Sequence, residues 1–179
     1  MKTILKLCIL IISGVLCHCY AQESYPKNGD NILNNDIDKF VGTWKWEENG
    51  SLFKIVLKKD NVKIPINMDL YGDVLYGWHE YIVNGSIIES NIQYINTPLN
   101  DKKYSLFSMG YKQNPKQIKL GIQHLSKNKS VDAQIEYIDS NHIKLISIKN
   151  YEGMRLNIPG KTPFDWSISL PKNIILTKQ

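Results

Sequence analysis

The stretch that decides the fold is TWKWEENGSLFKIV, residues 43–56. Asn49-Gly50 at its centre predicts a tight two-residue turn, because these residue types tolerate a positive φ and the flanks alternate between apolar and polar side chains. Pairing outward from the turn gives a face that we expect to be buried, with Trp46 opposite Phe53 and Trp44 opposite Ile55. The solvent-facing side pairs Lys45 with Lys54 and Thr43 with Val56. The stretch therefore predicts an antiparallel hairpin with one core-facing side.

A second Asn-Gly pair, Asn84-Gly85, predicts another hairpin by the same rule. One of its faces pairs Leu75 with Tyr94, Gly77 with Ile92, His79 with Ser90 and Tyr81 with Ile88. The other face pairs Tyr76 with Gln93, Trp78 with Asn91, Glu80 with Glu89 and Ile82 with Ile87. We expect the first face to lie inward, because burying two unpaired carboxylates together costs more than the apolar side chains beside them contribute. Trp78 is then expected to be exposed or covered by a loop.

The rest of the chain also shows the two-residue period of β-strands. The further strands that we expect span residues 104–111, 118–125, 131–138, 142–148 and 174–176. A short helical turn is expected at residues 36–41, before the first hairpin. The spacing predicts an all-β domain, an antiparallel up-and-down meander of eight or nine strands that forms a barrel or a strongly curved sheet.

The chain begins with the pattern of a secretory signal peptide. Two lysines precede an apolar run at residues 7–17, and Cys19-Tyr20-Ala21 is a small-residue cleavage pattern, so we expect residues 1–21 to be removed. The apolar run is shorter than the roughly 20 residues of a membrane-spanning helix. We expect a secreted or periplasmic protein, with a flexible lead-in at 22–35 and one β domain at 36–179. Lipid attachment through Cys17 or Cys19 is the alternative.

The amino-acid composition excludes several kinds of functional site. All three cysteines lie in the predicted leader, so the mature domain has no disulfide, thiol nucleophile or thiolate metal site. The net charge of +5 comes from scattered lysines with one arginine, which argues against a nucleic-acid partner. The chain lacks a Gly-x-Ser-x-Gly elbow and a phosphate-binding glycine loop, and no metal-ligand spacing links its histidines. We assign no catalytic, cofactor-binding or metal residue and favour a protein that is not an enzyme.

Phe40-Val41-Gly42-Thr43-Trp44 resembles the N-terminal signature of lipocalin-like (calycin) barrels. The resemblance implies that Trp44 closes one end of a barrel and that a basic side chain after the last barrel strand packs across it; Arg155 stands at that point. Gly42, Trp44 and Arg155 would then be structural residues, whereas the alternative makes Trp44 an ordinary core aromatic. The whole chain also resembles exported Bacteroidota proteins of unknown function that share a Gly-Thr-Trp start, which implies no activity.

The residues that could form a site are those expected to line the barrel interior. The candidates for a ligand cavity are Trp44, Trp46, Phe53, His79, Tyr81 and Ser90. His79 opposite Ser90 is either a polar contact that orients a ligand or a satisfied buried histidine. Glu80 opposite Glu89 is either an acid–base or cation-binding pair or part of a solvated outer face.

The function that we expect is a secreted, non-enzymatic binding module for a small apolar or amphipathic molecule. An eight-stranded barrel either holds one small ligand or fills itself with side chains. The alternative is a protein-interaction or inhibitor domain of the cell envelope, which would act through its loops or through the face that carries Trp78.

Overall fold

The computed structural model describes residues 25–110, 114–152, 160 and 162–179, so the predicted leader and Arg155 lie outside the described residues. The strands are β1 (Asn31–Ile32), β2 (Gly42–Glu48), β3 (Ser51–Lys63), β4 (Tyr71–Val83), β5 (Ser86–Ser90), β6 (Leu106–Ser108), β7 (Gln117–His124), β8 (Lys129–Asp139), β9 (His142–Asn150) and β10 (Ile174–Lys178). Four short 3-10 helices join them in the described part of the chain: η2 (Asn35–Phe40), η3 (Ile92–Tyr94), η4 (Leu99–Asp101) and η5 (Leu125–Lys127). No helix within these described ranges is long and apolar enough to cross a membrane.

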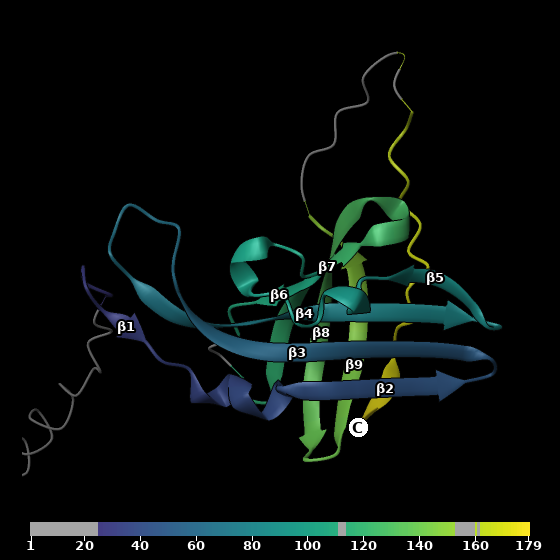
Figure 1. The fold of residues 1–179 in the computed structure, drawn as a ribbon, viewed down its shortest axis with the longest axis horizontal. Coiled ribbons are helices and arrows are strands. Elements are labelled where there is room, and N and C mark those ends of the chain that lie inside the picture. The colour runs from purple at the N-terminus through teal and green to yellow at the C-terminus, as the bar shows by residue number, and fades with distance from the viewer. Residues whose placement is uncertain (1–24, 111–113, 153–159, 161) are drawn as a thin grey trace, which may run out of the picture.

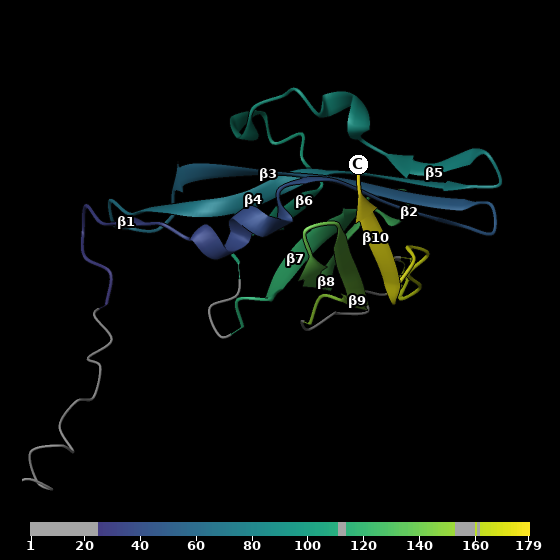
Figure 2. The same cartoon turned by 90° about the horizontal axis from the view of Figure 1, so that it is seen from below.

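Eight of these strands form a closed antiparallel barrel, as the sequence predicts. The order β4-β3-β2-β10-β9-β8-β7-β6 returns to β4, so each barrel strand has two neighbours and the meander closes where β10 pairs with β2. Closure satisfies the strand edges that an open sheet would expose. Figures 1 and 2 show that β2–β4 cross over β7–β9 as a second layer, which flattens the barrel around its core.

The long strand β4 pairs with three partners in succession along one edge. Its first residues pair with β1, which runs parallel to it, so the lead-in that was expected to be flexible contributes a short strand. Leu75–Gly77 then pairs with β6, and Glu80–Val83 pairs with β5. Strands β1 and β5 are therefore additions to the barrel at the two ends of one strand.

The first hairpin has the register that the Asn49-Gly50 turn predicts. Thr43, Trp44, Lys45 and Trp46 pair with Val56, Ile55, Lys54 and Phe53, respectively. Asn49 and Gly50 have φ values of 48° and 74°, as a turn with two left-handed residues requires.

The second hairpin differs from the prediction because of a β-bulge. Ile82 pairs with Ile87 as expected, but the ladder then skips Ile88, so Tyr81 faces Glu89 and Glu80 faces Ser90. An extra residue on one strand reverses the facing of every residue beyond it. The predicted pairs His79–Ser90 and Glu80–Glu89 are therefore wrong.

The second strand of this hairpin, β5, also ends earlier than predicted. Strand β5 stops at Ser90, so Leu75 and Gly77 pair with Ser108 and Leu106 of β6 instead of Tyr94 and Ile92. The chain between β5 and β6 folds back over the outer face of β3 and β4. There Val56, Tyr76 and Trp78 form a second apolar cluster, covered by Ile92, Tyr94, Ile95, Leu99, Tyr104 and Phe107. Trp78 is fully buried beneath this loop.

The barrel interior is packed with apolar side chains from all eight barrel strands. Helix η2 closes one end, where Ile37 and Phe40 are buried and the carbonyl oxygen of Phe40 accepts a 2.8 Å hydrogen bond from Nε1 of the buried Trp44. The ammonium group of Lys178 lies 5.1 Å from the Trp44 ring centroid. Gly42 has a φ of 137°, and a Cβ there would lie 2.9 Å from Cε of Lys178. A basic side chain thus packs across Trp44, and the described residue in that position is Lys178.

A substitution at Gly77 can test how closely β3 and β4 approach each other at this point of their register. A Cβ at Gly77 would overlap the carbonyl oxygen of Val56 in the adjacent strand, so we expect G77A to lower the free energy of unfolding by about 3 kcal/mol. The matched control is G121A, because a Cβ at Gly121 would lie 3.5 Å from the nearest carbonyl oxygen, an ordinary contact. Urea denaturation checks both variants, and equal stabilities would contradict the close approach at Gly77.

Candidate functional site

The predicted cavity residues lie in three different environments. Trp44, Phe53 and His79 are at most 1% exposed. Trp46 and Tyr81 are half-buried and pack against the main core. Ser90 lies on the opposite face, where its hydroxyl donates a 3.1 Å hydrogen bond to Oε1 of Glu80. The bulge at Ile88 accounts for this last difference, because it turns Ser90 outward and Glu89 inward.

Strand register places four inward residues in one row across the sheet: Trp46, Phe53, Tyr81 and Glu89. The rings of Phe53 and Tyr81 meet edge to face at 6.1 Å, and the ring of His79 lies 6.0 Å from that of Phe53. The row therefore begins with aromatic side chains and ends at a carboxylate.

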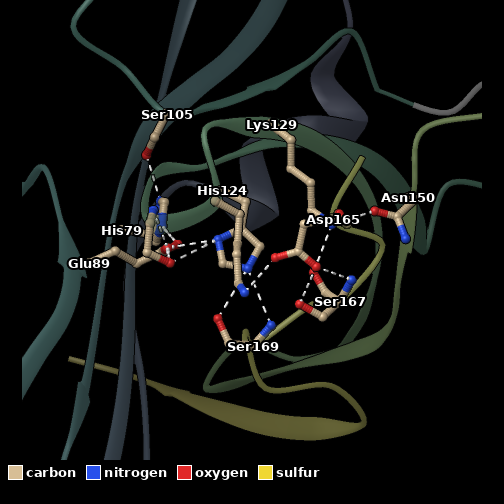
Figure 3. Close-up of polar contacts among 11 residues, drawn as sticks. His79, Glu89, Ser105, His124, Lys129, Asn150, Asp165, Ser167 and Ser169 are labelled. Atoms are coloured by element: carbon tan, nitrogen blue, oxygen red, sulfur yellow. Dashed lines mark hydrogen bonds and ion pairs between the residues drawn. The ribbon is translucent and has the colours of Figure 1, made fainter. Parts of the chain in front are cut away.

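The Glu89 carboxylate is the centre of a buried polar network (Figure 3). Its Oε1 lies 2.7 Å from Nε2 of His79, and its Oε2 lies 2.8 Å from Nδ1 of His124. The backbone N–H and the hydroxyl of Ser126 also donate to Oε2, at 2.9 and 2.6 Å. Glu89 and both histidine side chains are at most 1% exposed. Four donors thus surround one carboxylate inside the protein.

The hydrogen bonds of His124 assign its protonation state. The backbone N–H of Ser169 donates to Nε2 of His124 at 3.2 Å, so Nε2 carries no proton. The ring proton is then on Nδ1 and is donated to Glu89. Burial lowers the pKa of His124 and outweighs the adjacent Glu89 carboxylate, which raises it. His124 is accordingly a neutral imidazole.

His79 is also held by hydrogen bonds on its backbone and on its ring. The amide nitrogen of Asn91 donates to the carbonyl of Lys103, which leaves Oδ1 of Asn91 to accept from the backbone N–H of His79. The hydroxyl of Ser105 donates its single proton to that Oδ1, at 2.9 Å. Nδ1 of His79 lies 2.7 Å from the Ser105 oxygen, and Nε2 donates to the Glu89 carboxylate at 2.7 Å. Both ring nitrogens of His79 therefore have hydrogen-bond partners inside the protein.

Glu89 remains ionised despite its position. Burial raises the pKa of Glu89, but the hydrogen bonds from His79 and Ser126 favour the charged form and bring the value to about 2. The network therefore contains a buried negative charge and a neutral His124 that donates a hydrogen bond to it.

Residues 164–170, which we call the strap, form an irregular segment that covers the end of the barrel where the Glu89 network lies. The ammonium group of the buried Lys129 donates to the carbonyl oxygens of Asp165 and Ser167, at 2.6 and 2.7 Å, and to Oδ1 of Asn150 at 2.8 Å. The amide of Asn150 donates to the carbonyl of Trp166. Polar side chains of the barrel thus hold the main chain of the strap (Figure 3).

The strap also contributes apolar side chains to the core. Leu170 is 4% exposed and belongs to the main cluster, against which Ile168 also packs. This segment therefore plugs the barrel end with two aliphatic side chains while hydrogen bonds fix its backbone.

A family model described as a family of unknown function, DUF6705, matches residues 1–179. The chain belongs to the DUF6705 family. No curated protein and no solved structure matches it.

Ser169, His124 and Glu89 of this DUF6705 chain lie in the order of a hydrolytic triad, with the Ser169 hydroxyl oxygen 3.2 Å from Nε2 of His124. A general base, however, needs a free lone pair for the proton that it takes. The Ser169 backbone N–H already donates to that lone pair. The arrangement therefore favours a role in holding the strap over one in proton transfer.

Metal binding has no support in the same network. Both imidazole nitrogens that face Glu89 carry protons, and the described part of the chain contains no group of three or more His, Cys, Asp or Glu side chains that could hold a metal ion. The sequence pattern pairs Glu89 with Glu80. Only the bulge at Ile88 turns Glu89 inward, where it meets His124. No sequence motif marks Lys129 or Ser169 as a site residue.

We expect acid to destabilise this protein. The unfolded chain takes up a proton at His124 near pH 6.5, above the lowered pKa of the folded state. It also protonates Glu89 near pH 4.5, whereas the folded protein does so only at about 2. At both residues the unfolded state binds more protons, so the free energy of unfolding falls as the pH drops below about 6.5 and falls further below about 4.5.

Urea denaturation across this pH range checks the expectation. H124Q removes the titrating ring, and we expect it to flatten the profile between pH 6.5 and 4.5. The control is H142Q, because His142 lies outside this network and pairs with Asp139 at 2.9 Å; its profile should still fall between pH 6.5 and 4.5. A wild-type profile that is flat over this interval would contradict a neutral, buried His124.

Proposed function

We propose that this chain is an exported binding module whose barrel takes a small amphipathic molecule at the end covered by the strap. The observation that carries the proposal is the plug formed by Ile168 and Leu170. These side chains enter the core from an irregular segment, and an apolar ligand tail would fill the same volume. Replacing the strap side chains would cost such a ligand little, since its tail buries apolar area at a similar free energy per unit area.

The neighbouring side chains suit a ligand with two chemical parts. Trp46 and Tyr81 are half-buried aromatic residues of the inward row, and they would contact a tail. Lys129 now donates to strap carbonyl oxygens and would exchange them for the oxygen of a ligand head group. His124, which accepts from the strap backbone, would accept from a ligand hydroxyl. A carboxylic acid or alcohol with an aliphatic tail matches this set.

The lipocalin-like interpretation belongs to the same proposal. An eight-stranded meander barrel, entered through a short helix and Gly42-Thr43-Trp44, supports a likeness to that class. Export to the periplasm or the exterior is proposed from the leader pattern at residues 1–21 and from the resemblance to exported Bacteroidota proteins. The alternative is a protein-interaction or inhibitor domain that acts through its loops or through the Trp78 face. Trp78 is buried under the loop between β5 and β6, so the loops are the surface that this alternative would use.

A fluorescent fatty acid, 11-(dansylamino)undecanoic acid, tests the proposal. We expect the wild type to bind it, and I168A to bind it about tenfold more tightly, because the tail no longer displaces a half-buried isoleucine. The matched control is I175A, since Ile175 is 51% exposed on β10 and should leave affinity unchanged. Thermal unfolding verifies that both variants are folded. Absence of binding, or equal affinities of the wild type and I168A, would reject a site beneath the strap.

A further inference from the structure

The outer face of the barrel carries two adjoining grooves. One has a volume of about 450 Å³ and lies on β7–β9; the other, of about 490 Å³, lies on β6–β8 and the chain that leads into β6. Asp132 and Tyr151 line both grooves, so the two meet. Figure 2 shows β7–β9 in the layer opposite β3 and β4. Because outward side chains of the barrel strands line it, this groove is separate from the interior.

Side-chain amides form part of the polar lining. Gln117 and Gln134 lie side by side, with Nε2 of Gln134 donating to Oε1 of Gln117 at 2.8 Å, and Nε2 of Gln117 donating to Glu136 at 3.3 Å. In the second groove the hydroxyl of Ser130 donates to Oε1 of Gln123 at 3.0 Å. These bonds orient the amides across neighbouring strands. Each amide offers both donors and an acceptor, which matches ligand hydroxyl groups.

The charges of the groove nearly cancel. Lys119 and Asp132 form an ion pair at 3.0 Å, and this hydrogen bond raises the pKa of Lys119. The charged lining residues are Lys102, Lys119, Lys149, Asp132 and Glu152. Three lysines against two carboxylates produce a weak field, and no described lining residue is an arginine, the usual partner of phosphate and sulfate groups. The groove therefore suits a neutral ligand better than a polyanion.

Aromatic side chains complete the lining. Tyr151 is 55% exposed where the grooves meet. Tyr104 and Phe107 form a tilted pair with centroids 5.8 Å apart in the second groove. Gly121 leaves bare backbone between them and β8. Flat apolar rings beside hydrogen-bonding amides fit a ligand that has apolar ring faces and a polar rim.

We propose that this outer groove binds a neutral oligosaccharide. A sugar ring presents C–H faces to aromatic rings and hydroxyl groups to amides, and the two joined grooves accommodate consecutive sugar units. The inference goes beyond the proposed function, because it concerns the opposite side of the barrel wall and a different class of ligand.

Isothermal titration with soluble hexasaccharides tests the inference; the panel is cellohexaose, xylohexaose, maltohexaose and laminarihexaose. We expect at least one to bind, and Y151A and Q134A each to weaken that binding about tenfold. The controls are Y25A and Q93A, which change an 86% exposed tyrosine and an exposed glutamine outside the groove, and these should bind like the wild type.

Three results would overturn the inference. They are no binding of any hexasaccharide at about 1 mM, equal affinities of the wild type and the two groove variants, and tighter binding of heparin than of every neutral sugar. The dansylated fatty acid separates this site from the barrel interior, because Y151A and Q134A should bind that probe like the wild type. A failure at the groove and a failure beneath the strap are therefore distinguishable.

Discussion

The carboxylate of Glu89 is the contact on which the strap end of the barrel depends. It accepts hydrogen bonds from His79 of β4, from His124 of β7 and from Ser126 of η5, so it joins β5 to the far side of the barrel. A buried charge is tolerated only when paired and fully hydrogen-bonded, which explains why so many donors converge there. The opposite end needs no such network, because Ile37 and Phe40 close it by apolar packing.

The two ends of the barrel therefore differ in kind. Apolar closure is non-directional and tolerates small adjustments, whereas the network around Glu89 fixes one arrangement of donors and acceptors. His124 transmits that arrangement to the strap, since its proton faces Glu89 and its lone pair faces Ser169. The hydrogen bond that holds Ser169 of the strap thus depends on the protonation of a histidine that solvent does not reach.

The fold class and the first hairpin could be predicted from sequence because their signals are local. Asn49-Gly50 determines the turn, and alternation then sets every pair up to Thr43. The second hairpin has an equally clear turn, yet the extra residue Ile88 reverses Ser90 and Glu89, and nothing in the local pattern marks a bulge there. The strap could not be predicted, because Lys129 binds backbone carbonyl oxygens that any residue would supply.

The seam between β2 and β10 has a kinetic consequence. Lys178 pairs with Trp44, so the barrel closes through segments far apart in the chain, whereas most other ladders join neighbouring strands. Contacts of large sequence separation form slowly, since the entropy of closing a long loop is lost before the contact stabilises anything. Until then both strands present unpaired edges, which are templates for association between chains. The speed of that one closure sets how long a folding molecule is exposed to aggregation.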